Sequence, residues 1–108
     1  YVQDISVFLV SVFRMPVFTP PIRRRFNSVI HQFLDFSLTI ARENRDETFQ
    51  ARLAFAQARS FYTSTRFELN HTFAKEMFHR SMFLLETILR RAKKPWQDFT
   101  LPPGILYY

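Results

Sequence analysis

Apolar residues recur with a helical period over three long segments of the chain. In each segment they fall three or four residues apart, which places them on one face of an α-helix. This pattern predicts helices over about residues 22–42, 46–69 and 72–94, and Pro95 ends the last one because the residue before a proline disfavours helical geometry. The chain is therefore predicted to be all-α, with a three-helix antiparallel bundle over residues 22–94.

The two ends of the chain lack this pattern. Residues 1–21 begin with apolar and β-branched side chains and then contain Pro16, Pro20 and Pro21, which a continuing helix excludes. Residues 95–108 are rich in proline and aromatic side chains. We expect an extended or irregular N-terminal arm and an extended C-terminal tail, both held by other molecules.

The composition fits a small helical interaction protein. The 108 residues suit one domain with a modest core, yet they include 14 Phe, 4 Tyr and 1 Trp, and surplus aromatic rings are typical of interfaces. A single Gly argues against phosphate-binding loops and β-hairpins, and the absence of Cys excludes disulfides and thiolate metal sites. The longest apolar run near the N-terminus, residues 5–13, is too short to span a bilayer, so we expect a protein peripheral to the membrane, without a transmembrane helix.

Positive charge predicts an acidic or phosphate-bearing partner. The chain has 15 Lys and Arg against 9 Asp and Glu, a formal net charge of +6. A basic ridge is predicted along the second helix by arginines that recur every seven residues: Arg45, Arg52, Arg59 and Arg66. Acidic residues occur only at the ends of that helix, which leaves the ridge nearly unopposed. On charge alone, nucleic acid or anionic lipid would also serve as the partner.

Catalytic and metal chemistry find little support in the sequence. His31 and Asp35 stand four residues apart, a spacing that favours a local hydrogen bond over a general base and its orienting acid. His71 and His79 align on the third helix, but no third ligand follows at a suitable spacing. We expect no enzyme activity, no catalytic residue and no metal site.

One short motif and the tail resemble the LYR-motif family of small mitochondrial three-helix proteins. The stretch Arg66-Phe67-Glu68-Leu69-Asn70-His71 resembles the signature that ends the second helix of the family, whose Phe plugs the bundle. The tail over residues 94–104 looks like the exit from the bundle in the LYR-type accessory subunit of the complex I membrane arm.

Two registers of the Leu-Tyr-Arg signature of the family are open. In the first, the signature falls on residues 38–42, which keep Leu38 and Arg42 but lack the Tyr. In the second, it falls on residues 12–14, and residues 42–45 supply the later motif. Prolines interrupt the helix that should follow in the second register, so we favour the first.

The resemblance implies a non-catalytic accessory subunit of a mitochondrial respiratory complex, complex I, on the matrix side of the inner membrane. Members of the family bind the mitochondrial acyl carrier protein, whose phosphopantetheine-linked acyl chain enters the helical core, so the chain would need no cofactor of its own. By resemblance, the contacts to the carrier protein and its phosphate would be Arg42, Arg45, Arg59, Arg66 and Lys75. The acyl tunnel would be lined by Phe33, Phe36, Leu53, Ala56, Phe67 and Leu84. The alternative is a structural subunit of another mitochondrial assembly, a mitoribosome or another respiratory complex, with its Arg-rich face on RNA or lipid.

Overall fold

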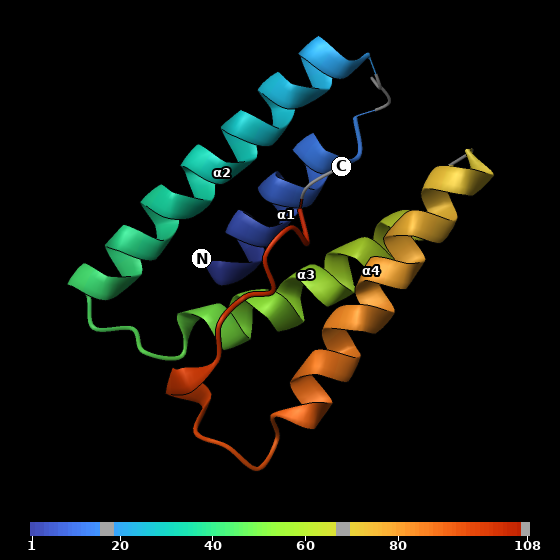
Figure 1. Ribbon diagram of the computed structural model, residues 1–108. Coiled ribbons are helices and arrows are strands. Elements are labelled where there is room, and N and C mark those ends of the chain that lie inside the picture. Colours follow the sequence, from blue (N-terminus) through green and yellow to red (C-terminus); the bar gives the residue numbers. More distant parts are fainter. Residues whose placement is uncertain (16–18, 67–69, 107–108) are drawn as a thin grey trace.

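The computed structural model of the chain describes residues 1–15, 19–66 and 70–106. Four α-helices follow one another along these residues: α1 (Val2–Phe13), α2 (Pro20–Glu43), α3 (Phe49–Thr65) and α4 (His71–Arg90). A short 3₁₀ helix, η1 (Trp96–Asp98), begins the C-terminal tail, and no strand occurs in the described ranges. The all-α prediction is confirmed, but the helices number four rather than the predicted three (Figure 1).

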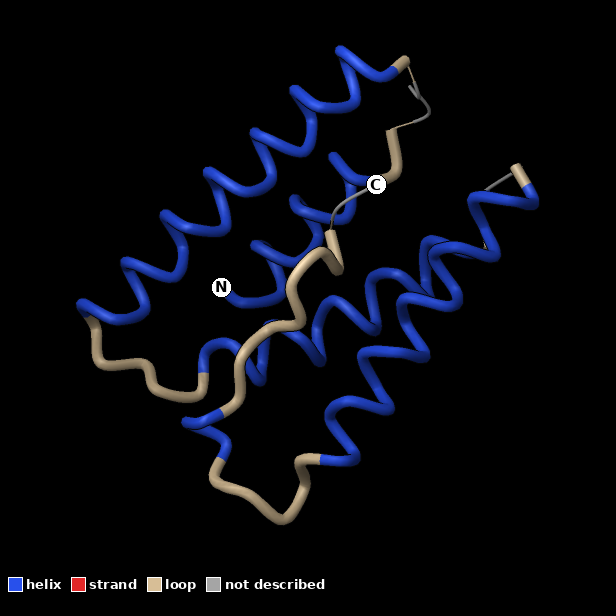
Figure 2. The backbone as a smooth tube through the Cα atoms, in the orientation of Figure 1, coloured by secondary structure: helices blue, strands red, loops and turns tan. Residues whose placement is uncertain are grey.

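The helices form an open array with α3 and α1 at its centre. α3 packs against α4 and also against α1, and α1 in turn packs against α2. α2 and α4 therefore lie at opposite edges of the array (Figure 1). The tail that follows η1 runs back across the array between these two edge helices (Figure 2). Because α2 has only α1 as an extensive neighbour, much of its circumference stays exposed.

The N-terminal arm predicted for residues 1–21 is a buried helix over most of its length. The prediction of an irregular arm is therefore wrong over Val2–Phe13, which form α1. Its β-branched residues each lower helix propensity by roughly half a kcal/mol, and the burial of Leu9 and Phe13, both 0% exposed, outweighs that cost. The prolines do separate two helices, because α2 begins at Pro20 and Pro21, where a missing N–H is harmless.

The three predicted helices are present with shifted ends. α2 matches its prediction within two residues. α3 begins later than predicted, at Phe49, because residues 46–48 form a turn in which the Phe49 N–H donates to the carbonyl oxygen of Asp46. The φ of 55° at Arg45 reverses the chain before this turn. α4 begins at His71, where Asn70 caps it: the side-chain oxygen of Asn70 accepts the Phe73 N–H at 3.0 Å.

Phe13, the last residue of α1, is the point at which the four helices meet. Its ring lies edge-on to Phe61 of α3, with ring centroids 5.3 Å apart, and stacks on Phe73 of α4 at 5.5 Å. The guanidinium carbons of Arg23 on α2 and Arg80 on α4 lie 5.2 and 4.7 Å from the centroid of the Phe13 ring. Each aromatic pair of this kind adds about 0.5–1.5 kcal/mol beyond the burial of the ring.

The two arginines beside Phe13 also bind backbone carbonyl groups where the chain reverses. Arg23 donates to the carbonyl oxygen of Phe13 at 2.6 Å. This oxygen lies at the end of α1, where carbonyl groups have no N–H partner within the helix. Arg80 donates to the carbonyl oxygen of Ile105 in the tail at 2.5 Å. A single pair of guanidinium groups therefore connects α1, α2, α4 and the tail.

The C-terminal tail is held by this chain itself. Phe99, Ile105 and Leu106 are 3, 7 and 2% exposed and belong to the main core. The backbone N–H of Leu101 donates to the side-chain oxygen of Gln50 on α3 at 2.8 Å. The prediction that other molecules hold both ends is therefore wrong for the described residues. Prolines exclude a regular helix from the tail but do not prevent its apolar side chains from being buried.

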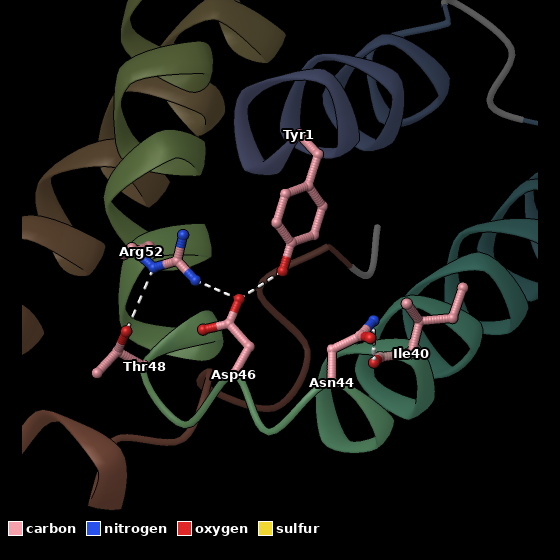
Figure 3. Close-up of polar contacts among 6 residues, drawn as sticks. All are labelled: Tyr1, Ile40, Asn44, Asp46, Thr48 and Arg52. Atoms are coloured by element: carbon pink, nitrogen blue, oxygen red, sulfur yellow. Dashed lines mark hydrogen bonds and ion pairs between the residues drawn. The ribbon is translucent and has the colours of Figure 1, made fainter.

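A polar cluster fixes the corner between α2 and α3 to the start of α1 (Figure 3). Asp46 accepts hydrogen bonds from the Tyr1 hydroxyl and the Arg52 guanidinium, and Arg52 also donates to Thr48 Oγ1 at 3.3 Å. The hydrogen bonds from Arg52 and then Tyr1 hold the pKa of the Asp46 carboxyl below its usual value. The same hydrogen bonds to Asp46 raise the pKa of Tyr1 and of Arg52.

Replacing Phe13 with Ala should lower the free energy of unfolding by about 3–5 kcal/mol, because it removes a fully buried ring and leaves a cavity. Urea unfolding followed by circular dichroism measures this loss. Phe55→Ala is the matched control: its ring is 60% exposed, so the change should stay within about 0.5 kcal/mol. Equal losses in the two variants would contradict the central position of Phe13.

Asp46→Asn should remove a pH-dependent contribution to stability. The depressed pKa of Asp46 in the folded chain means that its stabilisation is present at neutral pH and is lost as pH falls below the ordinary value of 3.8. The effect should be under about 1 kcal/mol, because 47% of the Arg52 side chain is open to solvent. The difference in unfolding free energy between wild type and variant, measured from neutral to acid pH, should shrink toward zero. A difference independent of pH would show that the Asp46 carboxylate is not the stabilising group.

Candidate docking surface on α3

The four arginines of the predicted ridge do not follow one helix. Arg52 and Arg59 lie on α3, Arg66 comes directly after its last residue, and Arg45 lies in the loop before it. Arg52 forms an ion pair with Asp46. The basic ridge is thus interrupted at its N-terminal end, and the prediction that its charges are unopposed is wrong for Arg52.

Arg59 stands between two surface cavities. A polar cavity of about 250 Å³ lies between α1 and α3, and an apolar cavity of about 250 Å³ lies between α3 and α4. Arg59 lines both of them. Its side chain is exposed and forms no ion pair with any residue that the structure describes. Its charge is therefore available to a ligand in either cavity.

The polar cavity is suited to an anion. Arg14, directly after α1, and Arg59 of α3 bring two guanidinium groups to it, and none of its described lining residues is acidic. Ser11, Thr63 and Ser64 also line it, as does Ser60, whose hydroxyl group pairs with that of Ser6 at 2.9 Å. Guanidinium groups bind phosphate and carboxylate with charge-assisted hydrogen bonds, and hydroxyl groups add further donors.

The apolar cavity places aromatic and aliphatic surface beside the same arginine. Phe55 and Tyr62 of α3 line it and are 60 and 53% exposed. Met82 of α4 lines the opposite side and is 36% exposed. The ring of Phe78 on α4 lies 6.4 Å from that of Tyr62, so the aromatic surface continues onto the second helix. Exposed rings next to a cation are typical of protein interfaces.

The other predicted partner contacts lie elsewhere on the surface. They are exposed and comprise Arg42, Arg45, Arg66 and Lys75. Arg42 lines a separate cavity of about 710 Å³ at the corner of α2 and α3, where Asp46 and Glu47 oppose its charge. Of the five predicted basic contacts, Arg59 is therefore the one that the structure places at the polar and apolar cavities of α3.

The predicted acyl-tunnel residues do not share one lining. Those that the structure describes are Phe33, Phe36, Leu53, Ala56 and Leu84, while Phe67 lies outside the described residues. Leu53 and Ala56 belong to a small core cluster, whereas Leu84 belongs to the main core, with Phe33 packed at its edge. Phe36 is 62% exposed. These side chains are thus divided between two core clusters and the surface.

Arg14 and the hydroxyl groups of the polar cavity are absent from the sequence-based prediction. An irregular arm over residues 1–21 gives Arg14 no fixed neighbour, so its position opposite Arg59 could not be derived. One signal was present, since Ser60, Thr63 and Ser64 are three and four residues apart and share a face of α3.

The two histidines aligned on the third predicted helix do not form a metal site with other residues of the described chain. His71 and His79 are exposed on α4, and no group of three or more potential metal ligands occurs in the ranges that the structure describes. None of the helices in those ranges is long and apolar enough to cross a bilayer. The absence of enzyme activity stays a prediction.

Comparison with known proteins gave no match: no protein-family model fits the chain, and no curated protein or solved structure is similar to it. The resemblance to the LYR-motif family therefore stays a prediction that rests on residues 66–71 and 94–104.

Proposed function

We propose that this chain is a non-catalytic docking subunit that binds an acidic, phosphate-bearing protein through the α3 surface around Arg59. The observation that supports this proposal is the placement of a cationic, hydroxyl-lined cavity directly beside exposed aromatic rings. Anionic groups of the partner would lie on Arg14 and Arg59, and its apolar groups would lie on Phe55 and Tyr62. Such a combination of charge and aromatic surface is typical of protein interfaces rather than of a solvated helix face.

The partner that the sequence resemblance favours is the mitochondrial acyl carrier protein. An acidic protein that carries phosphopantetheine matches the net charge of +6, and its phosphate matches the polar cavity. Charge-assisted hydrogen bonds of this kind contribute about 1.5–3 kcal/mol each. The chain would then be an accessory subunit of a mitochondrial respiratory complex, complex I by the resemblance of its tail.

The position of the acyl chain follows from where the apolar surface lies. In this proposal the acyl chain rests in the apolar cavity between α3 and α4, because the residues expected to form a tunnel are divided between separate clusters. Burial there contributes about 0.8 kcal/mol per methylene group that leaves water.

The interrupted basic ridge favours a compact anionic group over a long polyanion such as RNA. A nucleic acid strand needs a continuous positive track along its backbone. Here the pairing of Arg52 with Asp46 breaks the track on α3. The two guanidinium groups at the polar cavity, those of Arg14 and Arg59, suit one compact anionic group.

Arg59→Glu should weaken the binding of purified, phosphopantetheine-bearing acyl carrier protein at least about tenfold, because it removes charge-assisted hydrogen bonds and adds repulsion. Isothermal titration calorimetry at low and high salt measures this loss, and wild-type binding should itself weaken with salt. Arg24→Glu is the matched control, since it makes the same charge change at an exposed position on α2.

Two outcomes would contradict the proposal. An equal loss in both variants would show that binding reflects net charge rather than the α3 surface. No binding of the carrier to the wild-type chain would exclude this partner. The carrier without its phosphopantetheine group tests the polar cavity. It should bind the wild-type chain more weakly than the intact carrier does. The two forms of the carrier should bind Arg59→Glu with equal affinity.

A further inference from the structure

α2 carries two neighbouring stripes, and the more apolar one lies at the margin of the bundle, with half of its members exposed. The buried stripe comprises Arg23, Asn27, Ile30, Ser37 and Ala41, so that three of its five members are polar. The neighbouring stripe, called here the α2 seam, comprises only apolar residues: Ile22, Phe26, Val29, Phe33, Phe36 and Ile40. Ile22, Val29 and Phe36 are 43, 47 and 62% exposed, and the other three are half-buried. The fold of one chain therefore leaves Ile22, Val29 and Phe36 of this seam open, while Phe26 and Phe33 also pack against the main core.

The spacing of the α2 seam is that of a coiled coil. Successive members are four, three, four, three and four residues apart, the alternation of the a and d positions in a coiled coil. The seam extends about 27 Å at a rise of 1.5 Å per residue. The ring of Phe33 lies 4.4 Å from Phe8 of α1, which marks the edge where the seam meets the bundle. Glu43 occupies the next position of the repeat and ends the apolar stretch.

The α2 seam is complementary to a second copy of itself in the antiparallel direction. Pairing about its centre places Ile22 opposite Ile40, Phe26 opposite Phe36, and Val29 opposite Phe33 of the other copy, so every layer is apolar. In such a two-fold interface the same surface serves both subunits.

The charges that flank the α2 seam select the antiparallel direction. Arg25 is exposed beside its first half, and Glu43 is exposed beside its C-terminal end, whereas the exposed Arg24, Asp35 and Arg42 lie on the far side of α2. An antiparallel pair brings the positive half against the negative half, whereas a parallel pair brings like charges together. The helix dipoles also favour the antiparallel pair, because the positive end of one helix then lies beside the negative end of the other.

We propose that the chain forms a symmetric homodimer in which two α2 helices pair antiparallel through the α2 seam. This interface uses α2, whereas the candidate docking surface uses α1, α3 and α4, so the two proposals are independent. The dimer leaves both docking surfaces exposed and would bind two copies of a partner, or one partner with two sites at higher avidity.

Sedimentation equilibrium on the full chain tests the dimer. The wild type should show twice the 13.0 kDa mass of one chain. Val29→Glu and Phe36→Glu should each show the mass of one chain. Both positions lie on the open face, so far-UV circular dichroism should stay unchanged. Leu89→Glu on α4 is the control, because it charges a residue that is 74% exposed away from the seam and should leave the dimer intact.

Disulfide trapping tests the direction of pairing. The chain has no Cys, so an introduced thiol is the sole one. Gln32 lies beside the centre of the seam, and Gln32→Cys should form a covalent dimer under mild oxidation. Thr39→Cys should form at least about tenfold less covalent dimer alone, since its copies lie at opposite ends of an antiparallel pair. An equal mixture of Thr39→Cys and Arg25→Cys should cross-link.

Several results would overturn the proposal. A wild-type chain that stays monomeric, or a dimer that Val29→Glu and Phe36→Glu leave unchanged, would exclude pairing through the α2 seam. Cross-linking of Thr39→Cys with itself as readily as Gln32→Cys would exclude the antiparallel direction. A monomeric wild type that binds phosphatidylglycerol vesicles, with binding lost in Phe36→Glu, would show that the seam contacts membrane instead.

Discussion

The arrangement of the whole chain depends on the covered ring of Phe13 at the end of α1. Phe61 and Phe73 cover it from α3 and α4, and Arg23 and Arg80 cover it from α2 and α4. Both arginines also use their N–H groups to satisfy backbone carbonyl oxygens. Apolar rings are therefore buried, and backbone carbonyl oxygens are hydrogen-bonded, at the same place. Together these contacts hold the region where the four helices meet in one arrangement.

This central position of α1 decides which surfaces remain open. With α1 packed against both α2 and α3, the edge helix α2 has one extensive neighbour and exposes its most apolar stripe. α3 is covered by α1 and α4 but keeps an outer face with a cavity on either side of Arg59. A chain that leaves rings such as Phe36, Phe55 and Phe83 more than half exposed is suited to a role as a subunit, in which other copies or partners complete the burial.

Five arginines of this chain, Arg14, Arg23, Arg52, Arg59 and Arg80, fall into three roles that share one side-chain chemistry. Arg23 and Arg80 act inside the fold, where they bind backbone oxygens beside an aromatic ring. Arg52 holds the corner between α2 and α3 through Asp46. Arg14 and Arg59 meet at a cavity without acidic neighbours among the described residues, and so can serve a ligand. A count of charges cannot separate these roles, because each role depends on the groups that the fold brings beside the guanidinium.

The sequence by itself determined the helical class, three of the four helices and the separation imposed by the prolines, since these follow from local periodicity and backbone restriction. It also gave Arg59 as a candidate contact. It did not determine α1, because an apolar, β-branched segment is ambiguous until a neighbour buries it. Nor did it determine that Arg14 faces Arg59, or that α2 buries its polar stripe and exposes the apolar one. Those features depend on contacts between residues far apart in the chain, and only the tertiary structure decides them.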